Sequence, residues 1–375
     1  MSARFLTVVL ERAFNMRDGF GREIDYMRIS VIDSCNLNCY YCNPCDNNEH
    51  CHALNILSVK EVLCIVRAAT RLGIKHFRLT GGEPLLHPQL DEMVLQIKKI
   101  SGVSSVSLTT NAVLLAQHAK WLKEAGIDSI NVSLDTIDAS EYERITKKPL
   151  LEEVKHGINA AIECGIRVKI NVVLTPQTDV VALTRYVAKK GTDIRFIEMM
   201  PVGEGHTNGV EPYKKVIGTL SKLYGEPCRI NTEKTKEINS GNDKRKIPDN
   251  GPAEYYIFPE LGIRVGLIQA IHGKFCDTCN RIRVTADGRL MPCLGSSVTM
   301  DLVPDSWDFA DDAEKDFSIV RALRAAIKAK PRCHNFNDNA VTYTKTTETK
   351  TVETKTTELK AAEVNAARNM SRIGG

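Results

Sequence analysis

Six of the twelve cysteines in this 375-residue chain form two triplets whose spacing suits metal binding. The triplets are Cys35, Cys39 and Cys42, and Cys276, Cys279 and Cys293. Three thiolates are one fewer than a zinc ion or a closed iron–sulfur cluster usually takes. A 4Fe–4S cluster held by three cysteines would leave one iron open to a substrate or cofactor. Each triplet therefore predicts a 4Fe–4S cluster with an open iron, and a zinc site is the alternative.

The other six cysteines carry weaker signals. Cys64 and Cys164 lie within helical patterns and are expected to be core thiols. Cys45 and Cys51 follow the first triplet beside two histidines. They are either spare metal ligands or part of a solvated loop, and we favour the loop.

Composition excludes several classes of protein. The hydrophobic fraction of 43% and charged fraction of 26% are ordinary for a globular protein, and the net charge is only +4. No apolar run reaches the roughly 18 residues of a membrane span, and nothing suggests nucleic-acid binding. Without a secretory signal, clustered thiols favour metal binding in the cytoplasm. A mitochondrial matrix location is the weaker alternative, because Glu11 departs from the acid-poor pattern of transit peptides.

Alternating strand and helix patterns occupy residues 26–200 and must position the triplets. Amphipathic helices, such as 114–125 and 151–164, lie between most strands, and several end at a glycine, the expected C-cap. Six such units predict a parallel sheet with right-handed crossovers, either a barrel or an open doubly wound sheet. The predicted strands are 26–33, 76–82, 104–111, 129–135, 167–175 and 193–200.

Polar residues gather where the predicted strands end, which favours the barrel. The first triplet follows the first strand, Gly81-Gly82-Glu83-Pro84 follows the second, and Thr110-Asn111 follows the third. Ser133 and Asp135 lie at the fourth. Barrel enzymes place their chemistry at this face. After residue 225 the pattern changes to short strands and turns with a helix at 317–329.

The CxxxCxxC triplet after one strand and GGEP after the next resemble the radical S-adenosylmethionine superfamily. The second triplet, the adjoining Arg281 and Arg283, the RFIEMM strand and the final Gly374-Gly375 narrow the resemblance to the GTP 3′,8-cyclase family, also called the molybdenum cofactor biosynthesis protein A family. The resemblance covers residues 16–300 and the last six. It implies an α/β fold, an incomplete (β/α)6 TIM-type barrel with a C-terminal sheet region that carries the second cluster.

The resemblance also implies a division of the chain and an activity. The expected regions are an N-terminal extension (1–15), the partial barrel (16–225), the auxiliary-cluster domain (226–335), a repetitive threonine-lysine-glutamate spacer (336–368) and a diglycine tail (369–375). The implied reaction is conversion of GTP to 3′,8-cyclo-7,8-dihydro-GTP, the first step of molybdenum cofactor (molybdopterin) biosynthesis. A 5′-deoxyadenosyl radical would abstract the ribose 3′ hydrogen, and the 3′ carbon would then add to guanine C8.

Site residues follow from the same resemblance. The first triplet would hold the cluster that binds S-adenosylmethionine, and the second triplet the cluster that binds guanine. The residues expected to contact S-adenosylmethionine are Tyr41, Gly82, Glu83, Thr109, Ser133 and Met200. Those expected to contact GTP are Arg28, Arg78, Lys169, Arg195, Arg281 and Arg283, of which the last two also match catalytic positions.

Two features of this predicted GTP site differ from a simple match to the family. We expect Arg281 and Arg283, at alternate positions of a predicted strand, to point to opposite faces unless the strand bends. His76 stands where the family has a lysine, which a protonated histidine would partly replace. A lone arginine in a strand more often forms a salt bridge than binds a ligand. The basic residues of this chain lie together at positions that match the family, which favours a binding site.

The diglycine end allows three interpretations: a frayed terminus, a ubiquitin-like conjugation tail, or a tail that enters the active site and acts in catalysis. The resemblance favours the third for Gly374 and Gly375. It also implies an electron donor such as flavodoxin or ferredoxin and a downstream cyclic pyranopterin monophosphate synthase, and it allows a homodimer. The typical family start matches Met16, which leaves residues 1–15 as an upstream extension.

Two other functions fit the residues. A twin-cluster radical enzyme that modifies a peptide or another metabolite would need neither the basic set nor the diglycine. A non-catalytic iron–sulfur or metal-binding protein would need neither the basic residues nor the diglycine, and it would need no S-adenosylmethionine.

Overall fold

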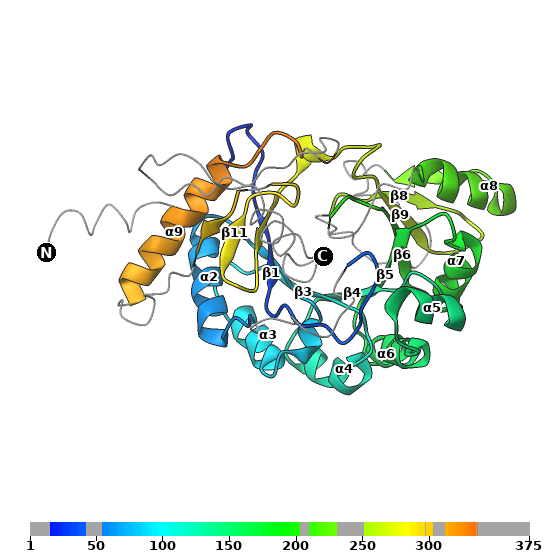
Figure 1. The fold of residues 1–375 in the computed structure, drawn as a ribbon, viewed down its shortest axis with the longest axis horizontal. Coiled ribbons are helices and arrows are strands. Elements are labelled where there is room, and N and C mark those ends of the chain that lie inside the picture. Colours follow the sequence, from blue (N-terminus) through cyan, green and yellow to red (C-terminus); the bar gives the residue numbers. More distant parts are fainter. Residues whose placement is uncertain are drawn as a thin grey trace, which may run out of the picture.

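The computed structural model describes residues 16–42, 55–202, 210–230, 251–296, 298–302, 312–334 and 336 of the protein. Within them, six strands run parallel and in chain order across one sheet, with helices between them (Figure 1). Each observed strand lies inside its predicted range. The strands are β1 (Tyr26–Ser30), β2 (His76–Thr80), β3 (Ser105–Thr110), β4 (Ser129–Ser133), β5 (Val168–Leu174) and β6 (Asp193–Glu198).

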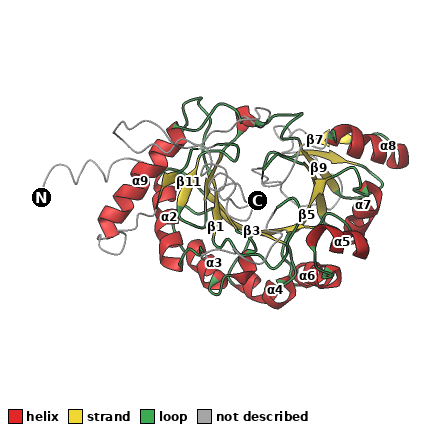
Figure 2. Cartoon of the chain, viewed as in Figure 1, coloured by secondary structure: helices red, strands yellow, loops and turns green. Residues whose placement is uncertain are grey.

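The helices between the strands form the outer layer of the molecule (Figure 2). Local capping chemistry marks several of their ends. Ser58 caps the first of them in a capping box with Glu61, and the glycines that follow four of them, including Gly73 and Gly126, have positive φ. The helices are α2 (Val59–Arg71), α3 (Leu90–Lys98), α4 (Leu115–Glu124), α5 (Ala139–Thr146), α6 (Leu151–Glu163), α7 (Val180–Lys189) and α8 (Gly218–Tyr224). Short turns of helix are η1 (Pro84–Leu86), η2 (Tyr213–Ile217) and η3 (Cys276–Thr278).

The C-terminal strands extend the same sheet at both edges. β9 (Arg264–Ile268) pairs parallel with β6, and β10 (Arg281–Val284) pairs parallel with β1. Antiparallel strands continue outward from each: β8 (Glu254–Ile257), β7 (Cys228–Ile230), β11 (Arg289–Met291) and β12 (Met300–Asp301). No ladder joins β9 to β10 in the described part of the chain, so the barrel is open. The incomplete barrel with a C-terminal sheet region is therefore confirmed.

Helix α9 (Asp312–Lys328) packs against α2 on the outside of the sheet. It confirms the predicted C-terminal helix, although it begins five residues earlier than the predicted 317. Through this contact the end of the chain described here returns to the first βα unit. None of the helices in the described ranges is long and apolar enough to cross a membrane.

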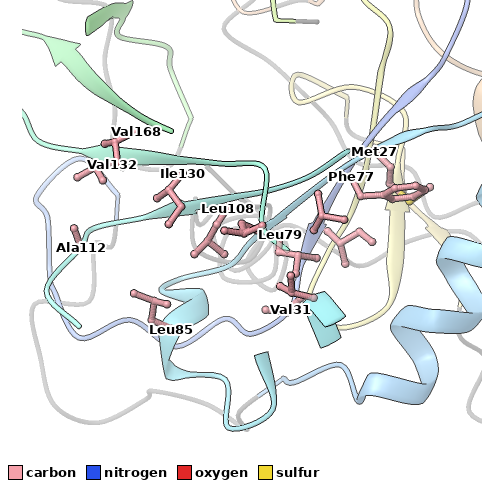
Figure 3. Close-up of a cluster of buried hydrophobic side chains, with 14 of the residues drawn as sticks. Met27, Val31, Phe77, Leu79, Leu85, Leu108, Ala112, Ile130, Val132 and Val168 are labelled. Atoms are coloured by element: carbon pink, nitrogen blue, oxygen red, sulfur yellow. The ribbon is translucent and has the colours of Figure 1, made fainter. Parts of the chain in front are cut away.

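Alternation along the strands separates the core from the site. The outward-facing side chains of neighbouring strands, such as Phe77, Leu79 and Leu108, are fully buried among the helices (Figure 3). Burying each such side chain contributes roughly 1.5–3 kcal/mol to folding. The residues between them point to the inside of the barrel, because successive side chains of a strand face opposite sides. On β2 that inner position is Arg78.

Candidate active site

One cavity of about 320 Å³ occupies the inside of the open barrel and contains both cysteine triplets. Most of the side chains predicted for the site line this cavity, although they come from both ends of the chain. The predicted residues that line it are Cys35, Cys39, Cys42, Cys276, Cys279, Cys293, Tyr41, Gly82, Thr109, Ser133, Met200, Arg28, Arg78, Arg195, Arg281 and Arg283.

The glycine pair after β2 lets the cysteine loop approach the sheet. Gly82 donates its backbone N–H to the carbonyl of Ile32 at 2.8 Å, and Glu83 donates to that of Ser34 at 2.8 Å. A Cβ on Gly82 would lie 2.1 Å from the Ser34 oxygen, and one on Gly81 would lie 2.3 Å from the Ile32 oxygen. Only glycine fits these two positions, so the motif fixes the start of the loop that carries Cys35.

Glu83 holds the next strand end in place. Its carboxylate, which is fully buried, accepts hydrogen bonds from the Thr110 hydroxyl and the Asn111 backbone N–H, both at 2.7 Å. The Asn111 side chain in turn donates to the Cys35 sulfur at 3.7 Å. Burial raises the pKa of Glu83 to about 7 despite these donors. Glu83 is not among the side chains that line the cavity, so its expected contact with S-adenosylmethionine stays a prediction.

The first triplet lies in acidic surroundings. Burial and the neighbouring Glu83 raise the pKa of Cys35 to about 11, while burial and Cys35 raise that of Cys42 to about 12. Asp135 adds to the increase at Cys42 and accepts a hydrogen bond from the Tyr41 hydroxyl. Burial also raises the pKa of Asp135 to about 6. Three thiolates can coexist here only if a positively charged group is bound among them.

The donor chemistry of the triplets fits a cluster better than a single ion. The thiols in each triplet influence one another's pKa, so they lie close together. Three thiolates are one fewer than a zinc ion usually takes, whereas cysteine thiolates are the ligands of iron–sulfur clusters. The donor set of each triplet therefore fits a cluster.

The second triplet lies in basic surroundings. Cys276 begins η3, Cys279 directly follows it, and Cys293 follows β11. Burial would raise the pKa of Cys279, but Arg281 and Lys330 outweigh it and lower the pKa to about 7. The Arg281 guanidinium also lies over the Phe275 ring, 4.9 Å from its centroid. This triplet therefore carries its own compensating positive charge.

Three arginines form one row across adjacent strands. Arg283 on β10 and Arg78 on β2 are both register partners of Arg28 on β1. Burial, followed by Arg283 and Arg78, lowers the pKa of Arg28, and burial with Arg281 lowers that of Arg283 to about 10. Like charges this close repel one another, and a bound polyanion would relieve that repulsion. Arg195 faces the same cavity and donates to the Asn171 side-chain oxygen at 3.0 Å.

The expectation that Arg281 and Arg283 point to opposite faces was wrong. Both line the cavity, and the residue between them, Ile282, is 1% exposed in the core. The physical reason is the two-residue period of a strand, which places positions i and i+2 on the same face. No bend is needed for both to meet one ligand.

Two predicted basic positions lie away from the cavity lining. Lys169 on β5 is 4% exposed, in register with Asn131 and Asp193. His76 lies at the start of β2, where its Nδ1 is 2.8 Å from the Ser105 hydroxyl. Burial lowers the pKa of His76, which opposes the protonated form that would replace a lysine.

The remaining predictions concern either the core or residues outside the described ranges. Cys64 is buried in α2, as expected, and Cys164 is half-buried at the end of α6. Cys45, Cys51, the repetitive spacer and the terminal Gly374 and Gly375 lie outside the described residues.

The sequence did not reveal two residues that contact the second triplet's segments but lie far from them in the chain. Arg22 donates to the Cys276 carbonyl at 2.6 Å, and Lys330 donates to the carbonyls of Arg281 and Pro292. Arg22 lies six residues after Met16, where the sequence shows only the typical start of the family. Lys330 follows a predicted helix and carries no local signal, because its contacts lie 38 and 49 residues away.

Comparison with known proteins identifies two family models in the chain. The model of the radical SAM superfamily matches residues 29–182, and the model named Molybdenum Cofactor Synthesis C matches residues 192–336. The GTP 3′,8-cyclase of Clostridium perfringens (strain SM101 / Type A) is 35% identical over 324 residues, covering 86% of this chain and 95% of that protein. The GTP 3′,8-cyclase of Peptoclostridium acidaminophilum is 37% identical over 328 residues, covering 86% and 94%.

Solved structures support the fold. Streptococcus suis SuiB bound to S-adenosylmethionine superposes with a TM-score of 0.53, at 14% identity, over 79% of this chain and 68% of that one. At this identity the likeness concerns the architecture of the barrel alone.

Proposed function

The chain belongs to the GTP 3′,8-cyclase family of the radical S-adenosylmethionine superfamily, and on that premise we propose that it converts GTP to (8S)-3′,8-cyclo-7,8-dihydroguanosine 5′-triphosphate. This reaction is the first step of molybdenum cofactor biosynthesis. Superfamily membership entails an iron–sulfur cluster and S-adenosylmethionine. The single observation that carries the proposal is a cavity with thiols beside acids on one side and arginines on the other.

The acidic side of the cavity suits a cationic cofactor. Cys35, Cys39 and Cys42 would hold the first cluster, and S-adenosylmethionine carries a sulfonium and an ammonium group. When bound, this pair supplies the radical that begins the reaction. Tyr41 is fixed by Asp135 beside the cluster loop, and Gly82, Thr109, Ser133 and Met200 border the same space. These residues would orient the cofactor. Glu83, which does not line the cavity, would support the cysteine loop through its contacts with the end of β3.

The basic side of the cavity suits a nucleoside triphosphate. The row of Arg283, Arg28 and Arg78 presents three guanidinium groups to the same space, and each can bind two phosphate oxygens. Arg195 and Arg281 line the same cavity, and Lys169, which is buried on β5, is the remaining proposed contact. Because the arginines repel one another, a triphosphate would gain affinity from relieving that repulsion.

The second triplet would hold an auxiliary cluster that receives the guanine base. Cys276, Cys279 and Cys293 lie in the same cavity as the arginine row, so a nucleotide could reach both. Arg281 and Arg283 would then act on the reacting nucleotide, since they leave the cluster loop on the cavity side. Gly374 and Gly375 are proposed to complete the site from the end of the chain, where glycine lacks a side chain that would obstruct a narrow space.

The proposal extends to the surroundings of the enzyme. A radical reaction of this kind needs an electron donor such as flavodoxin or ferredoxin, and its product is the substrate of a cyclic pyranopterin monophosphate synthase. A cytoplasmic location and a homodimer accompany the proposal as predictions.

The test is the product formed anaerobically by the reconstituted full-length chain from GTP, S-adenosylmethionine and a reductant. We expect a slow background of 5′-deoxyadenosine without GTP. With GTP, the additional 5′-deoxyadenosine and the cyclised nucleotide should form in equal amounts. Deletion of Gly374 and Gly375 should abolish the nucleotide product and leave the iron content unchanged. Cleavage of S-adenosylmethionine that ignores GTP and responds to a peptide would instead support the peptide-modifying alternative.

A further inference from the structure

The five residues from Lys330 to His334, which follow α9 after one intervening residue, close over the second triplet, and we call them the clasp. The clasp contacts each of the polypeptide segments that carry a cysteine of that triplet. The His334 backbone donates a hydrogen bond to the Cys276 thiol, and its ring Nε2 lies 2.8 Å from the Ala270 carbonyl. The clasp is thus attached to the loop before η3 as well as to η3 itself.

A buried ion pair anchors the clasp to the beginning of the described chain. The Arg22 guanidinium donates to the carbonyls of Cys276 and Pro331 at 2.6 Å and to that of Arg332 at 2.9 Å. Asp18 binds the Arg22 Nε at 2.6 Å, and both side chains are almost fully buried. Arg22 therefore joins the clasp to the first cysteine of the triplet.

Lys330 makes the corresponding connection to the other two cysteines. Its ammonium group donates to the Arg281 carbonyl at 2.7 Å, to the Pro292 carbonyl at 2.8 Å and to the Cys279 thiol. Arg281 lies two residues after Cys279, and Pro292 directly precedes Cys293. The two carbonyl contacts hold the ammonium group between these segments, and Lys330 also borders the cavity.

We propose that Lys330 is a positioning residue for the second iron–sulfur cluster, which joins the Cys279 and Cys293 segments and donates to the Cys279 sulfur. The inference rests on the proposed second cluster and adds to it a side chain that sets its occupancy and potential. Hydrogen bonds and positive charge at a cysteine sulfur favour the reduced cluster, because reduction adds negative charge there. Lys330 is 3% exposed, so water cannot replace its contacts easily.

The test compares Lys330→Met with Lys328→Met in the full-length chain after anaerobic reconstitution. Lys328 is exposed at the end of α9, two residues away, and is the matched control. Iron and sulfide are counted, and the reduced clusters are followed by electron paramagnetic resonance during a redox titration. Addition of S-adenosylmethionine identifies the first cluster, because it perturbs that signal alone.

We expect about eight irons in the wild type and in Lys328→Met. Lys330→Met should either fall toward about four irons or keep the second cluster at a more negative potential. Cleavage of S-adenosylmethionine without GTP should persist, which shows that the barrel is folded. If Lys330→Met is insoluble, Lys330→Gln, which keeps an amide donor without the charge, is expected to lower the potential.

Equal iron content and equal potential in the Lys330 and Lys328 variants would overturn the role of Lys330 and leave the proposed function intact. About four irons in the wild type would instead reject the second cluster itself, and with it the role of Lys330.

Discussion

At the first cysteine triplet, the charged side chains that act on the thiols are acidic, whereas at the second they are basic. Glu83 and Asp135 raise thiol pKa values on one side, and Arg281 and Lys330 lower that of Cys279 on the other. Both triplets nevertheless face one cavity. The polypeptide thus leaves positive charge to be supplied by the ligand at the first triplet and negative charge at the second.

Under the proposed function, this difference would assign the two ligands to the two sides of the cavity. The acidic side would stabilise a sulfonium cofactor, and the arginine row would stabilise a triphosphate. Exchange of the two would place like charges together in a partly buried space, which costs several kcal/mol. Charge alone would therefore favour the cofactor on one side of the cavity and the triphosphate on the other.

The largest expected effects come from removing one cysteine of each triplet. Cys35→Ala should lower cleavage of S-adenosylmethionine at least about a hundredfold, because even residues that only support a metal ligand cost up to that factor. Cys279→Ala should lower the cyclised product as much, while cleavage without GTP persists. Chromatography of 5′-deoxyadenosine and nucleotide products measures both. Equal loss of cleavage in the two variants would contradict the separate roles proposed for the two triplets.

Glu83 should make the acidic side sensitive to pH. Its pKa is raised from 4.5 to about 7 in the folded protein, so the folded state binds more protons than the unfolded chain between these values. The free energy of unfolding should therefore fall by about 2–3 kcal/mol as the pH rises through this window. Glu83→Gln carries no charge at any pH, so it should lack this decrease and match the wild type most closely at low pH. Denaturant titrations at pH 5 and 7.5 measure the difference, and identical slopes in both proteins would contradict it.

On the basic side, Arg283→Met should weaken binding of GTP by about ten- to thirtyfold, the value of one charge-assisted hydrogen bond pair. The effect should shrink as the salt concentration rises, since the interaction is electrostatic. Calorimetric titration measures the dissociation constant, and Arg67→Met, an exposed position on α2, is the control. Affinity for S-adenosylmethionine should stay unchanged, and an equal loss for both ligands would argue against two separate sides.

The smallest effect is expected for Asp135→Asn. An asparagine can still accept from the Val173 backbone and donate to Tyr41, so the geometry survives while the charge is lost. Affinity for S-adenosylmethionine should fall about five- to tenfold, and affinity for GTP should hold. Glu124→Gln, exposed at the end of α4, controls for a general change of charge. An increase in cofactor affinity would reverse the assignment of the acidic side.

The local part of this design was predictable from the sequence. Cysteine spacing, the glycine pair and the six strands are encoded within a few residues, because ligand loops, close backbone contacts and strand periods are short-range features. The residues predicted for the cofactor and GTP were placed by resemblance, and most of them line the cavity. The one wrong prediction about these residues was that Arg281 and Arg283 point to opposite faces, because positions i and i+2 of a strand share a face.

What only the tertiary structure decided is the electrostatic environment of each triplet. Arg22 and Cys276 are 254 residues apart in the chain, and Lys330 meets the Pro292 carbonyl across 38 residues. The arginine row exists because β10 pairs with β1 although more than 200 residues separate them. Sequence spacing specified which side chains could bind metal. Burial and long-range pairing decided their charge, because both depend on which segments the folded sheet brings together.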